Sequence, residues 1–245
     1  MNRNYISLAL ASILLTACGS SSSNKGDGRG SIDLADYFPA KSMTKTFSTV
    51  ERDGDDVEKS HYDEIIEVVG NTITTTVEGE VWDKTTITDK NITTEDDGEI
   101  ESMYRHVDLG DRFYSRKIEE SEDTPLGKVT RSLTHVCTIK YKEDRFEKDD
   151  NVYTGDLLKV ECLDKGTVNL DLKPSLSGYV SDDLNGSHDY YDTSYFYLKK
   201  GLGEVAAIND DCVINSKLPG EIIDDRKSGE ACATEQNYEY EFYLP

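Results

Sequence analysis

The chain has 245 residues, of which 49 are acidic and 27 basic, so its formal net charge at pH 7 is -22. This charge makes nucleic acids and anionic lipid surfaces poor partners, and it is compatible either with plain solubility or with binding of cations and basic partners. Fifteen tyrosines, together with abundant threonine, valine and isoleucine, favour strands over helices.

The N-terminus has the shape of a secretory signal. Arg3 is the one charge in residues 1–17, and an apolar and small stretch runs from Tyr5 to Ala17. Spanning a membrane takes about 20 apolar residues, so this stretch is too short. We predict that residues 1–17 are removed, which leaves 26 basic residues against 49 acidic ones and a formal charge of -23.

The segment Leu15-Thr16-Ala17-Cys18 resembles the lipobox of bacterial lipoproteins. The resemblance implies cleavage before Cys18 and acylation of its thiol, and each buried methylene of the acyl chains adds about 0.8 kcal/mol of membrane affinity. Gly19 replaces the aspartate that retains such proteins at the inner membrane, which implies the outer membrane. Whether the domain faces the periplasm or the outside stays open, and an ordinary signal peptide with a coincidental cysteine is the alternative.

A flexible linker and one domain follow. Residues 18–31 are rich in glycine and serine, and such a linker has an end-to-end distance of about 20 Å. Residues 32–245 are expected to form a single β-rich globular domain. Its one expected helical element is a short turn at Ile32–Tyr37, with Ser31 as N-cap.

The rest of the domain is predicted to be all-β and mainly antiparallel. Short alternating segments separated by Asp/Gly-rich turns favour a single curved sheet, a sandwich or a half-barrel. The expected strands are Met43–Arg52, Ser60–Val69, Asn71–Val77, Val81–Thr88, Glu99–Val107, Arg112–Ile118, Lys128–Lys142, Val152–Leu163, Thr167–Leu172, Ser194–Lys199, Leu202–Ile208 and Tyr238–Leu244.

Four cysteines remain after Cys18, and two disulfides are expected in an exported protein. Cys137 and Cys162 are equidistant from the turn-like Lys148–Asn151, so an antiparallel hairpin places them opposite each other. Gly155 is expected to mark a bulge in this hairpin. The predicted pairs are Cys137 with Cys162, Ile139 with Val160 and Tyr141 with Leu158 on an apolar side, and Thr138 with Glu161 and Lys140 with Lys159 on a polar side.

Cys212 and Cys232 are then paired by elimination, which closes a loop worth about 3 to 4 kcal/mol in the chain-entropy model. A metal site on the four cysteines is not predicted, because they form no Cys-x-x-Cys pair and no histidine is expected to lie close to them.

Two further segments resemble uncharacterised exported bacterial lipoproteins: Asp36-Tyr37-Phe38-Pro39, and the stretch from Tyr195 to Val205. This resemblance implies a β-rich envelope lipoprotein and no particular ligand. Within the second segment, Gly201-Leu202-Gly203 is interpreted as a hairpin turn that needs positive φ, because no helix start follows it as a phosphate loop requires.

No catalytic motif is present. His61, His106, His135 and His188 are scattered and match no metal-ligand spacing. His61 with Glu64, or His188 with Asp189, would belong to a site only if the fold assembled one. The acidic stretch Ser181–Asp189 offers oxygen ligands for calcium but does not match an EF-hand, so a solvated acidic loop is preferred and neither metal nor cofactor is predicted.

Asn91 and Asn185 lie in segments of the form acidic-x-Asn-x-Ser/Thr, which resembles the acceptor of bacterial N-glycosylation systems. Both are expected at turns, where a glycan would be accessible, and both matches can arise by chance in so acidic a chain.

The sequence therefore predicts a lipid-anchored envelope protein with a non-enzymatic binding or structural role, whose partner is an envelope protein or a glycan. The alternative is a carrier that holds an apolar ligand such as a lipid in the concavity of a curved sheet. An enzyme with an unrecognised site is the least favoured reading.

Overall fold

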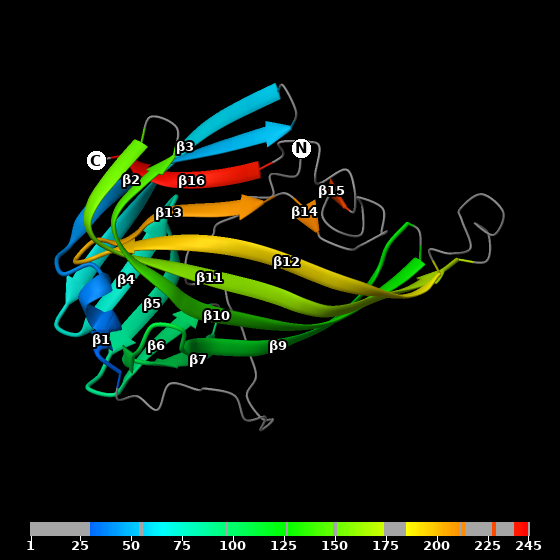
Figure 1. Ribbon diagram of the computed structural model, residues 1–245, viewed down its shortest axis with the longest axis horizontal. Helices are drawn as coiled ribbons and strands as arrows, with labels where there is room; N and C mark the ends of the chain where they lie inside the picture. The colour runs from blue at the N-terminus through cyan, green and yellow to red at the C-terminus, as the bar shows by residue number, and fades with distance from the viewer. Residues whose placement is uncertain are drawn as a thin grey trace.

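A computed structural model of the chain describes residues 30–53, 56–96, 98–125, 127–148, 151–173, 185–210, 212–213, 227–228 and 238–244. This part is almost entirely antiparallel β-structure, as predicted (Figure 1). Its elements are β1 (Ile32–Asp33), the 3-10 helix η1 (Leu34–Tyr37), β2 (Met43–Asp53), β3 (Asp56–Val69), β4 (Thr72–Val77), β5 (Glu80–Ile87), β6 (Asn91–Asp96), β7 (Glu99–Tyr104), β8 (His106–Val107), β9 (Arg112–Asp123), β10 (Gly127–Lys148), β11 (Asn151–Leu172), β12 (Gly186–Lys199), β13 (Gly203–Asp210), β14 (Cys212–Val213), β15 (Lys227–Ser228) and β16 (Tyr238–Leu244).

One 12-stranded sheet dominates the described residues, in the order β7-β6-β5-β4-β3-β2-β16-β13-β12-β11-β10-β9. It consists of two meanders, β2–β7 and β9–β13, in which chain neighbours pair antiparallel. The strand β16 pairs with β13 on one side and with β2 on the other. The end of the chain therefore joins the two meanders into one sheet.

The sheet is strongly curved but remains open. Figure 1 shows its two halves bending toward each other, so that the edge strands β7 and β9 lie side by side. They are not paired as neighbours in the sheet, but the Tyr114 hydroxyl of β9 donates to Oε1 of Glu101 on β7 at 2.7 Å. The curvature gives the sheet a concave face on which residues from both meanders converge.

The main apolar core fills one end of this concave face. Leu34 and Tyr37 of η1 are buried there against side chains from β6, β7 and β9–β13. Two-stranded pairing of β1 with β8 holds the start of this segment in place. The helical turn was predicted, but its N-cap is Asp33 rather than Ser31: the Asp33 carboxylate accepts the Ala35 N–H at 3.0 Å.

The predicted hairpin is confirmed at its centre. Cys137 lies opposite Cys162 in a disulfide, and the pairs Ile139 with Val160 and Thr138 with Glu161 are as expected. The two outer pairs are wrong, because a bulge between Ile139 and Tyr141 shifts the register by one residue. The observed partners are Tyr141 with Lys159 and Lys142 with Leu158, while Lys140 forms an ion pair with Glu161 at 2.6 Å.

A second irregularity lies at Gly155, as predicted, where φ is +99° and the register shifts again. Beyond it, Phe146 and Tyr153 of the hairpin tip pack against Tyr197 of β12. Tyr197 follows Phe196, which belongs to the concave core, so Tyr197 and the tip lie on the convex face. The rings of Phe146 and Tyr197 stack there with centroids 3.7 Å apart. The tip thus covers part of the outside of the joined sheet.

Several predicted boundaries change. Strand β6 was not predicted, because Asn91 and its neighbours were interpreted as a turn. The segments Val152–Leu163 and Thr167–Leu172 are parts of one strand, β11, which like β10 has 22 residues, and β12 begins at Gly186 rather than Ser194. The signal, the lipobox with Cys18, nearly all of the linker, Cys232 and residues 181–184 lie outside the described residues.

The disulfide leads to a stability prediction. Its cysteines are 25 residues apart, so the variant with Cys137→Ser and Cys162→Ser should lose about 3 kcal/mol of unfolding free energy, because the cross-link restricts the unfolded chain. Urea unfolding of the two proteins measures this difference. A loss below about 1 kcal/mol would mean that the hairpin is held by its strand pairing alone.

Candidate functional site

A pocket opens on the concave face where β2–β7 meet β13 and the segment that follows η1. It encloses about 80 Å³. Its wall combines apolar side chains with four charged ones. The lining residues are Tyr37, Phe38, Pro39, Lys45, Glu64, Ile66, Ile73, Thr75, Asp83, Thr85, Thr94, Met103, Gly203 and Glu204.

Cross-strand pairing places the polar side chains of the pocket. Lys45 lies directly opposite Glu64 on β3, and Thr75 lies opposite Asp83 on β5. Such opposed residues have neighbouring side chains on one face of the sheet. Glu204 reaches the same pocket from β13, in the other meander. The site therefore exists only because the curved sheet brings its two halves together.

Lys45 is fully enclosed, with 2% of its surface exposed. Its ammonium donates to the backbone carbonyl of Glu204 and lies 3.8 Å from Oε2 of Glu64. The same nitrogen sits 4.4 Å from the centroid of the Phe47 ring, a cation–π distance. A buried lysine needs such partners, because an isolated charge would be expelled from the interior.

The pocket is nevertheless acidic, since it contains three carboxyl groups and one ammonium group. Burial raises the pKa of Asp83 to about 6, partly opposed by hydrogen bonds from Thr75 and Thr85 and assisted by the nearby charge of Glu64. Burial also raises the pKa of Glu64, although Lys45 acts against this. Ionisable groups that are held away from their ordinary pKa in a concave site are typical of functional sites.

An aromatic row continues from the pocket across the concave face. Phe47 of β2 stacks on Tyr62 of β3 at 5.5 Å, and Tyr62 is 6.1 Å from Trp82 of β5. Tyr243 of β16 flanks Phe47 on the other side, at 6.2 Å. Trp82 is the sole tryptophan of the chain and directly precedes Asp83. The row gives the pocket a large apolar border and a built-in fluorophore.

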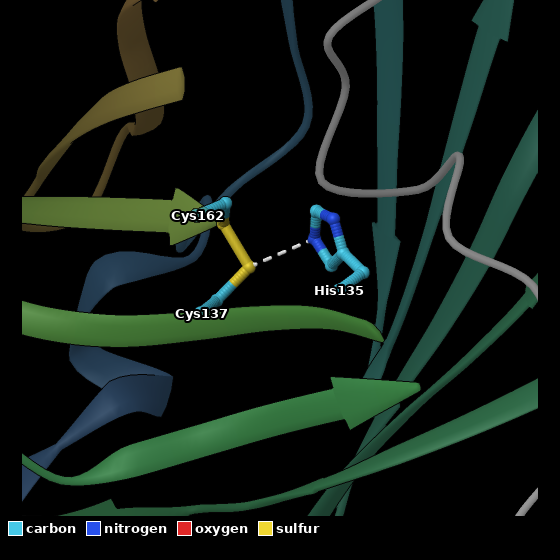
Figure 2. Close-up of side chains that lie close together, drawn as sticks. All are labelled: His135, Cys137 and Cys162. Atoms are coloured by element: carbon cyan, nitrogen blue, oxygen red, sulfur yellow. Dashed lines mark hydrogen bonds between the residues drawn. A yellow bond between two sulfur atoms is a disulfide. The ribbon is translucent and has the colours of Figure 1, made fainter. Parts of the chain in front are cut away.

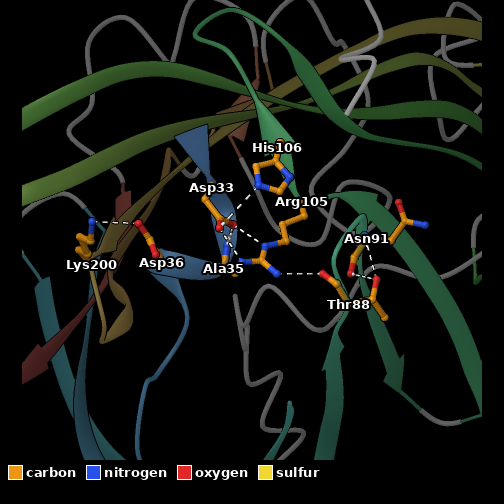
Figure 3. A network of polar contacts seen from close by, with 8 residues as sticks. All are labelled: Asp33, Ala35, Asp36, Thr88, Asn91, Arg105, His106 and Lys200. Atoms are coloured by element: carbon orange, nitrogen blue, oxygen red, sulfur yellow. Dashed lines mark hydrogen bonds and ion pairs between the residues drawn. The ribbon is translucent and has the colours of Figure 1, made fainter. Parts of the chain in front are cut away.

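The residues that follow the linker form one wall of the pocket, and polar contacts fix them in place (Figure 3). Asp33 accepts from Nε and Nη2 of Arg105 at 2.7 and 2.6 Å, a bidentate pair, and His106 lies 3.7 Å away. Hydrogen bonding to Arg105 lowers the pKa of Asp33. On the opposite side, Lys200 pairs with Asp36 at 2.9 Å. The segment is thus clamped to both meanders.

The two segments with lipoprotein resemblance meet at this wall. The backbone N–H of Gly201 donates to the Asp36 carbonyl at 2.7 Å, and the Ala40 N–H donates to Gly201 at 3.2 Å. Gly201 and Gly203 have positive φ, as the turn interpretation predicted. A Cβ on Gly203 would lie 3.2 Å from Pro39, so a side chain there would press on the pocket wall.

A second cluster lies on β10 and β11, in two adjacent rows of the concave face. His135 is opposite Asp164, and Cys137 is opposite Cys162. Figure 2 shows the imidazole pointing at the disulfide: Nε2 is 3.1 Å from Sγ of Cys137, while Nδ1 is 2.7 Å from Oδ1 of Asp164. The ligand atoms of His135 and the two cysteines all lie within 4.8 Å of one another.

The histidine row continues on both sides, from Arg116 of β9 through His135 and Asp164 to Asp192 of β12. Tyr114 packs edge-on against the His135 ring, with centroids 5.8 Å apart. Burial raises the pKa of the Glu101 carboxyl that accepts the Tyr114 hydroxyl. Much of the concave face is therefore polar and buried, in contrast to an ordinary apolar core.

The other histidine pairs considered in the sequence do not form sites. His61 is exposed while Glu64 is buried, because their spacing places them on opposite faces of β3. His188 and Asp189 are consecutive on β12 and also point to opposite faces. His106 belongs to the clamp at Asp33.

Asn91 begins β6 and is half-buried, whereas Asn185 is exposed and its Oδ1 accepts the Leu172 N–H at 3.0 Å. Asn91 is joined to Thr88 by three hydrogen bonds that close the β5–β6 turn (Figure 3). Both asparagines lie at strand starts, and their glycosylation stays a prediction.

Sequence reasoning missed the pocket and the role of His135. The pocket residues are spread from Tyr37 to Glu204, and no short-range spacing connects them. His135 did carry a signal: it precedes Cys137 by two residues, and on a strand this spacing puts both side chains on one face.

Comparison with known proteins adds no relationship, since no family, curated protein or solved structure matches the chain significantly. Within the described residues, no helix is long and apolar enough to cross a membrane.

Asp83 leads to a pH prediction. Its pKa of about 6 in the folded protein exceeds the ordinary value of 3.8, so the folded state binds the proton more tightly than the unfolded state. The unfolding free energy should therefore fall as pH rises from about 4 to about 6, by on the order of 2 kcal/mol for this group. Asp83→Asn should remove that part of the pH dependence.

Urea unfolding of wild type and variant at pH 4 and pH 8 measures this effect. Glu67→Gln, at an exposed carboxyl on β3, is the control and should leave the difference between the two pH values unchanged. An Asp83→Asn variant with the pH dependence of the wild type would contradict the assignment.

Proposed function

We propose that this chain is a lipid-anchored lipoprotein of the bacterial outer membrane with a non-enzymatic binding role, and that its concave pocket binds a small ammonium group. The observation that carries the ligand class is the composition of the pocket: three carboxyl groups and one lysine face a mostly apolar wall. The lysine is already engaged by Glu204, Glu64 and Phe47. Asp83, which is not among these partners of Lys45, complements an added cation.

The apolar wall fits the body that carries such a group. Ile66, Ile73 and Met103 lie on the sheet side, and Phe38 and Pro39 lie on the clamped segment. A primary ammonium on a short aliphatic chain or on a sugar ring combines both features. In the envelope, such groups occur on lysine side chains of proteins and on amino sugars of glycans, which are the two partner types expected from the sequence.

The alternative proposal, a lipid carrier, receives less support from this pocket. A drug-sized or larger apolar ligand requires about 300 Å³ or more, whereas this pocket encloses about 80 Å³. An acyl chain offers neither hydrogen bonds nor charge, so burying the charged side chains of the pocket beneath it would be unfavourable. A small polar ligand satisfies both the volume and the chemistry.

Anchoring by acyl chains on Cys18 supports a role close to a membrane surface that the acidic domain would not bind electrostatically. The linker connects this anchor to the segment that forms the pocket wall. A partner held in the pocket would therefore be kept near the membrane by a short tether.

Ligand binding is tested with Trp82 as the reporter. Butylammonium, an Nα-acetyl-lysine amide and glucosamine are titrated while tryptophan emission is followed, with butanol and N-acetylglucosamine as neutral analogues. We expect saturable changes with at least one ammonium probe and none with the neutral analogues. Asp83→Asn should weaken binding about tenfold or more, because a charge-assisted contact is lost.

The pH dependence provides a second criterion. Binding should weaken as pH falls through about 6, because protonated Asp83 no longer attracts a cation. Glu67→Gln removes a charge from the exposed face of β3 and should leave the affinity unchanged. Equal affinity for charged and neutral probes would refute the proposed ligand class.

The anchor is tested separately with Cys18→Ser. The variant lacks the thiol to be acylated, so it should be released from the membrane fraction or should accumulate unprocessed. Fractionation and intact mass measure both outcomes. A variant that stays acylated and membrane-bound would show that Cys18 is not the anchor.

A further inference from the structure

We propose that His135, Cys137 and Cys162 form a binding site for a thiophilic monovalent metal ion, Cu⁺, when the Cys137–Cys162 disulfide is reduced. This site is distinct from the acidic pocket and does not depend on the proposed ligand. In the oxidised protein the same residues form the disulfide and its imidazole contact. The disulfide therefore determines whether the site is available.

The three donors lie together on one face of one hairpin. The sulfur atoms come from directly opposed residues of β10 and β11, and His135 lies on the same face two residues before Cys137. All three donor atoms are within 4.8 Å of one another. The two sulfurs are bonded to each other in the oxidised protein, so they must separate on reduction, by rotation of the two cysteine side chains, before thiolates at about 2.3 Å and imidazole at about 2.0 Å can surround one metal ion.

Asp164 orients the imidazole in the way that metal sites require. Its carboxylate lies 2.7 Å from Nδ1, so a neutral ring donates its Nδ1–H to Asp164 and directs the Nε2 lone pair at the sulfur atoms. A disulfide sulfur has no proton to offer this lone pair. A metal ion between the sulfurs and Nε2 would accept it, and the carboxylate–histidine–metal arrangement is common in metalloproteins.

The environment favours Cu⁺ over Zn²⁺. Cys137 and Cys162 are each 1% exposed and His135 is 7% exposed, so a bound ion would have little access to solvent ligands. Zn²⁺ in proteins takes four ligands, whereas this cluster supplies three. Soft thiolate donors select Cu⁺, which is stable with fewer ligands.

A dithiol serves as the reductant of the Cys137–Cys162 disulfide. The dithiol is oxidised to its cyclic disulfide, while the Cys137–Cys162 bond breaks and each sulfur receives one electron and one proton. Cu⁺ then forms bonds to the two sulfurs and to Nε2, and two protons leave the thiols. Metal loading should therefore release protons, as thiolate ligation requires.

The test uses the full chain, reduced with dithiothreitol, freed of reductant without oxygen, and titrated with Cu⁺ against the coloured chelator bicinchoninate. In a variant with Cys18→Ser, Cys212→Ser and Cys232→Ser, which has no other thiols, the reduced protein should take one Cu⁺ per chain and the oxidised protein none. X-ray absorption should report two sulfur ligands and one nitrogen ligand. The variant with Cys212→Ser and Cys232→Ser should retain this site, and the variant with Cys137→Ser and Cys162→Ser should lose it.

Two histidine variants separate ligation from general effects. His135→Ala should remove the nitrogen ligand and weaken binding at least tenfold, whereas His61→Ala, at an exposed histidine, should have no effect. Asp164 is a positioning residue, so Asp164→Asn should weaken Cu⁺ binding about 10- to 100-fold while the disulfide of the oxidised protein still forms.

Circular dichroism of the reduced, metal-free chain shows whether loss of the disulfide unfolds the hairpin. Cu⁺ should then restore the β-sheet spectrum, because the ion replaces the cross-link. The proposal is overturned if reduced wild type binds no more Cu⁺ than the Cys137→Ser, Cys162→Ser variant, whether or not it remains folded.

Discussion

The pairing of β16 with both β2 and β13 is the constraint on which the rest of the structure depends. Without this strand, β2–β7 and β9–β13 would be separate meanders, each with an additional open edge. With it, the sheet curves far enough that Lys45 of β2 reaches the backbone carbonyl of Glu204 on β13, 159 residues away in the chain. The pocket, the clamp on the segment after the linker and the Tyr114–Glu101 contact all require this closure.

The buried polar groups of the concave face lower the stability of the folded protein, and this points to a function. Burying a carboxyl group is unfavourable unless it is paired or hydrogen-bonded. Asp83 receives hydroxyl contacts from Thr75 and Thr85, but its raised pKa means that these do not fully offset the burial. Carboxyl groups with raised pKa values in a concave site are typical of functional sites.

Sequence reasoning reached the parts of the fold that are governed by local periodicity. The hairpin could be predicted because residues alternate sides with period two, so one turn and two cysteines fix the register. The prediction failed beyond Ile139, where a bulge at Lys140 inserts one residue without a glycine or proline to mark it. The pocket could not be predicted, because its acidic groups lie on β3, β5 and β13 and meet only through the curvature of the whole sheet.

The two candidate sites differ in how much of the fold each one needs. The cysteine–histidine cluster lies within one hairpin, so its geometry is set by β10 and β11 pairing alone. The acidic pocket combines β2–β7 with β13 and the residues directly after the linker. The end of the linker is tied to the sheet at Ser31, whose N–H and hydroxyl both donate to Oδ1 of Asp108, and the pairing of β1 with β8 follows. The Asp33–Arg105 and Asp36–Lys200 pairs then clamp the pocket wall. The pocket wall is therefore continuous with the N-terminal end of the described chain, and the same segment packs through Leu34 and Tyr37 on the core that contains Cys137 and Cys162.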